Sequence, residues 1–589
     1  MNKLYSLFFE LLRIFLHFLY LLHYCHQQVF NFVYESSETL STTNSQSSSG
    51  NTRKFSEPTK SSPRRICIIG AGASGLAALK TIISDYSNVE FKVMVFEKQD
   101  KVGGLWNYET HEKQQQSREY MRKSSQELTN KEGDDLENIS PMYSSLHTNT
   151  SRDMMGFSDF PMPAHFPDFP SCPQVNEYLN LYALKFKLKQ YIVFKTEVVS
   201  VKKETQNNYS KSQQQLPTWI VTTKNLETGQ QVDREFDVVL VGNGRNTKIR
   251  VPKVFQTLSN TYKLGKVFHS KYYEDDYEIF KDKTVLVVGS GSSGSDIASR
   301  IALVTDNTYI TVQKGASLIP KYLDGEPIDF NWIRRRYFSW IPKLVQKHLA
   351  NLFVNRKLPH SKLYHPFNSN PSRNHTVGLS SELIIEIGFG RVKVMPPIVS
   401  FSELEINFEN GKKLAPDFIV LCTGYELDFP FLDPNILKLD ETNSSSTLLY
   451  ENLFHMDYPN LIFLSLPFTV HPLLVGELQA RYVVSVLTGS ISIPSKLHIM
   501  LSNEKKLEQL EQTNINPRKF FHREYHLEYC DKLARLGGFY PNPFKYDNSK
   551  YFTSLVFGPL YGVHYRMDGP GKLDEKEIDQ ILSRYNSAR

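Results

Sequence analysis

Cysteine is scarce in this chain: its 589 residues include only five, and these lie far apart in the sequence. None stands in a CxxC pair or in a cluster with histidine, so neither a disulfide scaffold nor a zinc site is expected. Basic blocks are missing too, because 68 Lys and Arg against 62 Asp and Glu give a net charge of +6 that is spread along the chain. This pattern argues against a nucleic-acid partner.

The overall composition is that of a folded globular protein. Hydrophobic residues make up 40% of the chain and charged residues 22%, with 30 glycines and 30 prolines. These fractions exclude fibrous, collagen-like and wholly disordered chains. The length is sufficient for one large core or for two interleaved domains.

The N-terminal apolar run, residues 4–23, is interrupted by charge. It holds thirteen Leu, Phe or Ile, worth about −6 kcal/mol for membrane insertion, but Glu10 and Arg13 near its centre return about +5 to +6 kcal/mol. No clear small-residue cleavage site follows, which argues against a signal peptide. Residues 1–35 are therefore interpreted either as a membrane-associated segment or as an extension without a membrane role.

The residues after this segment have the composition of a linker. Fifteen of the 27 positions in 36–62 are Ser or Thr, so a disordered linker is expected, with the folded body beginning near Pro63. If residues 4–23 bind a membrane, a shallow helix on the cytosolic face, for example of the endoplasmic reticulum, is favoured over a span. A span would carry the body to the glycosylating side, where Asn149-Thr150-Ser151 is an acceptor pattern. Otherwise the protein is expected in the cytoplasm.

The folded body contains the same order of elements twice, about 220 residues apart. Each copy has a short apolar run, a helical pattern that opens with glycines, and a second apolar run, which together predict a βαβ unit. The expected elements are a strand at 65–70, a helix at 75–84 and a strand at 89–98, then a strand at 284–289, a helix at 292–304 and a strand at 308–314.

Both units carry a glycine pattern between the first strand and the helix: Gly70-x-Gly72-x-x-Gly75 and Gly289-x-Gly291-x-x-Gly294. The first glycine permits a sharp turn, the second lets a pyrophosphate approach the backbone, and the third lets helix and strand pack closely. The strand–helix context makes each a predicted dinucleotide site. The neighbouring residues expected to contact the nucleotides are Ala71, Ala73 and Ser74 in the first unit and Ser293, Ser295 and Asp296 in the second.

In each βαβ unit, the residue at the end of the second strand indicates which nucleotide the unit binds. Glu97 lies 22 residues past Gly75, where a carboxylate accepts hydrogen bonds from a ribose 2′-OH, as suits FAD or NAD. The matching strand of the second unit ends in Gln313-Lys314, where a cation would pair with the 2′-phosphate of NADP.

A second quasi-repeat, FDVVLVGNG at 236–244 and PDFIVLCTG at 416–424, flanks the second unit. This arrangement predicts an α/β fold with two Rossmann-like dinucleotide-binding domains, the NADP domain being inserted into the FAD domain. Thr423 and Gly424 are expected at the cofactor site. The expected domains are the first part of the FAD domain at 63–245, the NADP domain at 246–415 with an insertion at about 316–376, the second part of the FAD domain at 416–575, and a polar tail at 576–589.

Two further blocks follow Glu97. Gly103–Trp106 reads GGLW, and the segment Tyr143–Pro163 contains HTNTSRDMMGFSDFPMP. Both are similar to blocks of the flavin-containing monooxygenases, the first to a turn of that family and the second to its active-site segment.

Four later blocks extend this resemblance, which runs from about Ile66 to Lys572. Gly265, His269 and Tyr273 have the spacing of the family sequence FxGxxxHxxxY. Two departures are Lys263, which replaces the leading Phe, and Asn243-Gly244-Arg245, where the family often has Thr-Gly-His. The C-terminal blocks that resemble animal members are Glu477–Tyr482, Phe557–Pro559 and Gly569–Lys572.

The resemblance implies a specific chemistry with FAD and NADP(H) as cofactors. NADPH reduces FAD, the reduced flavin forms a C4a-hydroperoxide with O₂, and a small nucleophile, an amine nitrogen or a sulfide sulfur, takes up the distal oxygen. Asn149 is the one side chain for which the resemblance implies a catalytic role, because an amide can donate a hydrogen bond beside the flavin. His269 is expected to shape the NADP site rather than to act as acid or base. The other residues implied in cofactor binding are Gly104, Leu105, Trp106, Thr148 and Thr150.

Alternative functions remain open at this point. A Baeyer–Villiger ketone monooxygenase shares the two-domain layout, but its motif has Trp-Pro where this chain has Tyr273-Glu274. A pyridine-nucleotide disulfide reductase would need a CxxxxC pair after the first unit, and the sequence has none. A membrane-tethered flavoprotein NADPH oxidase without oxygen transfer should have broken glycine patterns or lack Asn149, and both are intact. The sequence indicates no oligomeric state.

Overall fold

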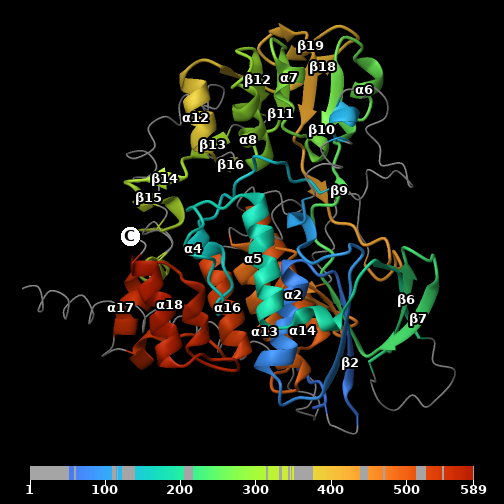
Figure 1. The fold of residues 1–589 in the computed structure, drawn as a ribbon, viewed down its shortest axis with the longest axis vertical. Helices are drawn as coiled ribbons and strands as arrows, with labels where there is room; N and C mark the ends of the chain where they lie inside the picture. Colours follow the sequence, from blue (N-terminus) through green and yellow to red (C-terminus); the bar gives the residue numbers. More distant parts are fainter. Residues whose placement is uncertain are drawn as a thin grey trace, which may run out of the picture.

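Two β-sheets, one above the other in Figure 1, form the centres of the two lobes. The larger has seven strands and the smaller five. The computed structural model describes residues 52–58, 62–108, 115, 117–121, 140–204, 216–312, 316–330, 335–342, 345–346, 348–349, 376–437, 449–467, 471–512, 526–546 and 550–587.

The first sheet has the strand order β23-β24-β25-β8-β2-β3-β4, and its central strands are parallel. The side chains of β8, of β25 and of the last four residues of β2 are buried, which is why the sequence reads there as continuous apolar runs rather than as alternation. The predicted strand pair of the first unit is confirmed. The strands are β2 (Arg64–Ile69), β3 (Phe91–Phe96), β4 (Ile192–Val193), β8 (Val238–Val241), β23 (Leu449–Tyr450), β24 (Phe454–His455) and β25 (Leu461–Phe463).

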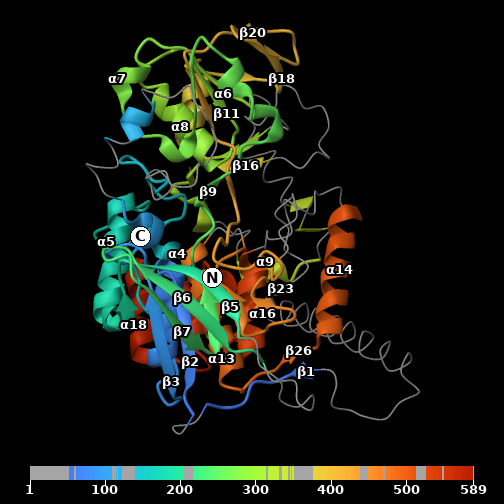
Figure 2. The ribbon, with the colours of Figure 1, turned by 90° about the vertical axis from the view of Figure 1, so that its right-hand side faces the viewer.

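Helices cover one side of this sheet and a smaller sheet covers the other. The helix α13 (Pro472–Leu487) is buried around its whole circumference, between α2 (Ala73–Lys80) and α16 (His526–Gly537). Figure 2 shows the antiparallel sheet β5-β6-β7 in front of β2 and β3. Its strands are β5 (Thr196–Lys203), β6 (Trp219–Asn225) and β7 (Gln231–Phe236).

The second sheet is parallel throughout, in the order β10-β21-β11-β12-β17. The predicted second βαβ unit is confirmed as β11, α8 and β12. The elements are β10 (Lys266–His269), β11 (Val285–Val288), α8 (Ser292–Ile301), β12 (Thr308–Thr311), α12 (Ser381–Gly388), β17 (Val392–Met395) and β21 (Phe418–Leu421).

The insertion of one domain into the other is confirmed, but its second boundary is corrected. The second sheet lies in sequence between β8 and β25 of the first sheet. However, β21 pairs with β10 and β11, so the boundary expected at 415/416 was wrong and the chain crosses back after Leu421. A buried parallel strand has the same composition in either sheet, so residue types alone did not assign it. The two crossing segments pair with each other as β9 (Lys248–Ile249) and β22 (Tyr425–Glu426).

The linker expected at 36–62 is wrong in its last part. The short strand β1 (Thr52–Arg53) pairs with β26 (Ile493–Pro494), and Phe55 is buried in the main core. Arg53 also donates from Nη1 to the carbonyl oxygen of Met456 at 2.7 Å. Strand pairing at a sheet edge uses backbone groups and requires no particular composition, so this contact could not be predicted from the Ser-rich sequence. Residues 1–51 lie outside the described residues.

The expected polar tail at 576–589 is also corrected, because most of it is the helix α18 (Glu575–Ser587). Ile578, Leu582 and Tyr585 are buried at i, i+4 and i+7, which is a narrow apolar stripe on a polar helix. The rings of Tyr585 and Tyr561 stack with centroids 4.3 Å apart. Because few apolar residues stand among many charged ones, the sequence did not predict this amphipathic helix.

A cluster of buried charges joins distant parts of the first lobe. This charge cluster consists of Lys80, Asp85, Asp159, Glu477 and Arg566, all at most 6% exposed. Arg566 lies 2.7 Å from Asp85, 3.1 Å from Asp159 and in contact with Glu477, while Lys80 binds both aspartates. The cluster thereby links α2, the segment after Asn149, α13 and the C-terminal region.

Candidate functional site

The first glycine turn lies at the carboxyl end of β2. A Cβ on Gly75 would stand 2.0 Å from the carbonyl oxygen of Gly70, so only glycine lets α2 begin this close to the strand. The same holds in the second turn, where a Cβ on Gly294 would stand 1.9 Å from the carbonyl oxygen of Gly289. Both turns therefore have the close helix–strand packing on which the sequence prediction was based.

Glu97 follows β3 directly and lies beside the first turn. Its Oε2 accepts from the Ala71 backbone N–H at 2.6 Å, and its Oε1 accepts from that of Gln99 at 2.9 Å. The side chain is buried, and this burial raises the pKa of the Glu97 carboxyl. The carboxylate thus fixes the turn and stands at the strand end where a ribose hydroxyl would meet it.

The GGLW block folds over the first turn. The Gly103 backbone N–H donates to the carbonyl oxygen of Ala71 at 3.1 Å, and η2 (Gly104–Trp106) follows, with Gly104, Leu105 and Trp106 partly buried. The first turn also contacts the second part of the FAD domain, because Ser74 Oγ lies 2.6 Å from Ser465 Oγ. Ser465 was missed by the sequence reading because it stands in no motif.

The second glycine turn is open. The residues at the start of α8 are exposed or half-exposed, namely Gly291, Ser292 and Ser293. Ser295, by contrast, is buried, and its Oγ donates to the Ser290 carbonyl oxygen at 3.4 Å. A Cβ on Gly291 would meet nothing within 4 Å. The helix N-terminus therefore presents free backbone N–H groups to an anion.

The open position at Gly291 allows a role in nucleotide binding to be distinguished from a role in folding. Gly291→Ala should leave the melting temperature unchanged, because no neighbour obstructs the new methyl group, but should raise the KM for NADPH about tenfold or more by keeping a pyrophosphate from the backbone. Gly388→Ala is the matched control, since Gly388 also has open space but lies at the end of α12. An unchanged KM in Gly291→Ala would contradict the assignment of this turn.

Lys314, predicted to meet the 2′-phosphate of NADP, lies outside the described residues. The strand β12 ends at Thr311. The role of Lys314 therefore stays a prediction.

The segment that begins at Tyr143 runs between the two lobes and is held by carboxylates of the second. Tyr143 donates its hydroxyl to Asp296, and Arg300 donates from Nη2 to the Ser145 carbonyl oxygen at 2.6 Å. Asp275 accepts from Ser144 Oγ at 2.7 Å and from the Ser145 backbone N–H at 2.8 Å. Asp296, expected at the nucleotide, is thus engaged at the interface between the lobes.

Asn149 lies in the middle of this segment. The Thr148 backbone N–H donates to the carbonyl oxygen of Pro170 at 2.9 Å, and Thr148 Oγ1 donates to that of Thr150 at 2.8 Å. Both threonines are buried, whereas Asn149 is half-buried. The Asn149 side chain makes no hydrogen bond within the described part of the chain, which leaves its amide available to a ligand.

His269 ties the second sheet to the crossing segment. Its Nδ1 accepts from the Lys271 backbone N–H and its Nε2 donates to the Gly424 carbonyl oxygen, both at 3.1 Å. Burial lowers the pKa of His269 to about 4, so the imidazole is neutral at neutral pH. Beside it, Thr423 Oγ1 donates to the Arg250 carbonyl oxygen. This geometry agrees with a shaping role for His269 rather than acid–base work.

The rest of the FxGxxxHxxxY block likewise packs against neighbouring segments. A Cβ on Gly265 would stand 2.3 Å from the Pro416 carbonyl oxygen, so glycine lets β10 approach the segment that enters β21. Tyr273 is fully buried. Lys263 is exposed, and its backbone N–H donates to the Glu403 carbonyl oxygen at 2.8 Å, so the replacement of Phe leaves the backbone anchored.

Arg245, the second departure from the family sequence, follows β8 where the chain first passes from the first lobe to the second. Its Nη1 donates to the Leu466 carbonyl oxygen at 2.7 Å, and burial lowers the pKa of Arg245 to about 10. The guanidinium therefore remains charged at neutral pH beside the strand end.

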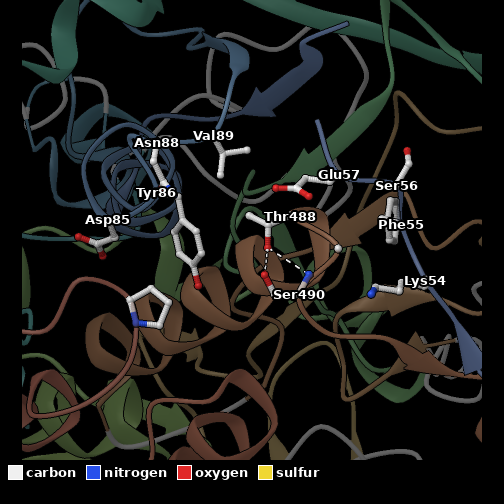
Figure 3. A pocket seen from close by; sticks show the side chains of 12 residues that line it. Lys54, Phe55, Ser56, Glu57, Asp85, Tyr86, Asn88, Val89, Thr488 and Ser490 are labelled. Carbon is white, nitrogen blue, oxygen red and sulfur yellow. Dashed lines mark hydrogen bonds between the residues drawn. The ribbon is translucent and has the colours of Figure 1, made fainter. Parts of the chain in front are cut away.

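A cavity of about 690 Å³ lies elsewhere, at the amino end of β3. Figure 3 shows Asp85, Tyr86, Asn88 and Val89 on one side of it and Thr488 and Ser490 nearby. Because dinucleotides bind at the carboxyl ends of parallel strands, this cavity is separate from the glycine turns.

Comparison with known proteins assigns the chain to one group. The sequence model described as flavin-binding monooxygenase-like matches residues 63–134 and 128–588. Flavin-containing monooxygenase 5 of Homo sapiens is 30% identical over 523 residues, which cover 87% of this chain and 90% of that protein. Flavin-containing monooxygenase 1 of Rattus norvegicus is also 30% identical, over 520 residues, with 86% and 90% covered.

Solved structures share the fold at lower identity. The S-allyl-L-cysteine S-oxygenase of Allium sativum is 23% identical with a TM-score of 0.58, over 89% of this chain and 99% of that one. Cyclohexanone monooxygenase is 14% identical with a TM-score of 0.53, over 80% of this chain and 97% of that one.

Proposed function

The chain belongs to the flavin-binding monooxygenase-like family and is an FAD- and NADPH-dependent monooxygenase, and we propose that the described glycine turns and Asn149 form its active site. The first turn, with Glu97 and the GGLW block, would hold FAD. The second turn, at the open N-terminus of α8, would hold NADPH. The observation that carries this proposal is the segment of Asn149, which is bound to the second lobe through Asp296 and Asp275 and to the first lobe through the Thr148 backbone.

The residues present fit these groups. The close-packed turns at Gly75 and Gly294 match the packing that dinucleotide sites require, and Gly291 leaves open the approach that a phosphate needs. Bound FAD, once reduced by NADPH, supplies the activation of O₂. The chain's part is to bind, orient and exclude water, and the Asn149 amide can donate a hydrogen bond to the bound cofactors.

An amine nitrogen or a sulfide sulfur is the proposed acceptor of oxygen, with a ketone as the alternative. The fold is shared with a ketone monooxygenase and so does not separate the two. Glu274, however, is fully buried, and its carboxylate accepts from Tyr108 Oη at 2.6 Å and from the Ser144 backbone N–H at 3.1 Å. A proline at 274, as in the ketone-oxygenating motif, would lose both contacts.

A substrate panel tests this choice. NADPH oxidation, product and hydrogen peroxide should be measured together over amines, sulfides and ketones. We expect oxygenated products from amines or sulfides, with at most minor lactone or ester formation. Products from ketones alone would establish the alternative, and peroxide alone would indicate an oxidase.

The N-terminal segment 4–23 is proposed to lie on the cytosolic surface of an internal membrane. Its Glu10 and Arg13 could reach headgroups from a shallow helix. Across the described residues, every helix is too short or too polar to cross a bilayer, and residues 4–23 are not among them.

Removing residues 1–50 should move the protein from the membrane pellet to the soluble fraction while FAD content and turnover stay at the parental level. The cut spares β1 and Phe55, which belong to the folded body. Removing residues 1–60 instead is the matched control, and it should lower thermal stability because it deletes that strand and that buried ring. A full-length protein that is already soluble would contradict the membrane role.

A further inference from the structure

A buried carboxylate from the insertion lies behind the segment of Asn149. Asp329 stands in η7 (Ile328–Phe330), which follows the hairpin of β14 (Tyr322–Leu323) and β15 (Glu326–Pro327). Its side chain is only 1% exposed. Figure 1 shows this hairpin next to α4 (Arg152–Met155), the helix that begins just after Asn149.

The Asp329 carboxylate binds the backbone of that segment directly. Its Oδ2 accepts from the Ser151 backbone N–H at 2.7 Å. Ser151 is the N-cap residue of α4 and stands two residues after Asn149. A hydrogen bond to a charged acceptor is about twice as strong as a neutral one, and burial of both groups increases its effect.

The backbone around Asn149 is therefore anchored on both sides. Before it, the Thr148 N–H donates to the Pro170 carbonyl oxygen at 2.9 Å. After it, Asp329 holds the Ser151 N–H. The Asn149 side chain makes no hydrogen bond within the described residues, so its position depends on the backbone that these two anchors hold.

A third part of the chain meets Asp329. His471 Nε2, also 1% exposed, lies 3.9 Å from Asp329 Oδ2, and α13 begins at the next residue. Asp329 thus stands where the insertion, the segment of Asn149 and the central helix of the first lobe come together.

We propose that Asp329 is a positioning residue that holds the Asn149 amide in place through the Ser151 N–H. The inference rests on the proposed role of Asn149. It also connects the insertion to oxygen transfer, because a displacement of η7 would move the peptide that carries Asn149.

Asp329→Ala in the full-length, FAD-loaded protein tests the proposal. Hydrogen–deuterium exchange of the peptide 148–155 should become about tenfold faster at the Ser151 amide, since its acceptor is gone. A larger share of the oxidised NADPH should appear as hydrogen peroxide, while FAD content and the rate of flavin reduction by NADPH stay parental. Asp329→Asn keeps an acceptor without the charge, so both effects should be present but smaller.

Tyr322→Phe is the matched control. It removes another hydrogen bond between the insertion and the same stretch of chain, from Tyr322 Oη to Asp168 Oδ2 at 2.8 Å, and leaves the acceptor of the Ser151 N–H in place. Parental exchange and coupling in Asp329→Ala would overturn the inference, as would equal uncoupling in Tyr322→Phe. If Asp329→Ala does not retain FAD, Asp329→Asn decides, and parental values for both measurements overturn it. A parent enzyme that oxygenates nothing would refute the proposed function instead, and the exchange result would still report on the Asp329 contact.

Discussion

Asn149→Ala should keep FAD and its reduction by NADPH but lower product formation about 100-fold or more, with hydrogen peroxide released instead. Loss of one preorganised donor in an active site typically has an effect of this size. The side chain is half-buried, makes no hydrogen bond within the described chain, and lies in the segment that joins the two lobes. The measurement is the ratio of oxygenated product to NADPH consumed.

His147→Ala is the control for this variant, because His147 is exposed in the same segment and, among the described residues, its ring hydrogen-bonds only with the Ser145 carbonyl oxygen. Its ratio of product to NADPH should equal that of the parent. If Asn149→Ala oxygenates a sulfide as efficiently as the parent, Asn149 does not have the proposed role.

Arg566→Met should lower the free energy of unfolding by about 3–5 kcal/mol. Removing one partner from a buried ion pair leaves buried charge uncompensated, and here the three carboxylates Asp85, Asp159 and Glu477 would keep only Lys80 within the cluster. Methionine keeps much of the volume, so the effect measured by denaturant unfolding would report on charge rather than on a cavity.

A surface ion pair provides the comparison. Lys413 and Glu405 lie 2.6 Å apart with side chains 62% and 35% exposed, so Lys413→Met should change stability by less than about 1 kcal/mol. Equal stability of Arg566→Met and Lys413→Met would show that the charge cluster contributes nothing.

The glycine turns could be predicted from the sequence because their requirement is local. Gly75 and Gly294 each face a carbonyl oxygen five residues earlier in the chain, and any Cβ would collide with it. The apolar runs around them are likewise local, which is why both βαβ units were found with small errors in their ends.

Contacts between distant residues were not predictable in this way. The assignment of β21 to the second sheet depends on its pairing with β10 and β11, and the burial of Phe55 depends on β26. Asp329 stands in no motif, and Glu274 is marked in the sequence only as a departure from the ketone-oxygenating motif, yet their carboxylates hold the segment of Asn149 from two sides. Their partners lie 178 and 130 residues away in sequence, so only the fold reveals them.

The most direct test of the account is the fate of molecular oxygen. The full-length enzyme should be supplied with ¹⁸O₂, NADPH and the amine or sulfide of the panel that it turns over best. The account predicts one ¹⁸O atom in each product molecule, the second oxygen atom reduced to water, and one NADPH oxidised per product. Unlabelled product, or NADPH oxidation that yields hydrogen peroxide and no oxygenated product from any amine or sulfide, would contradict it.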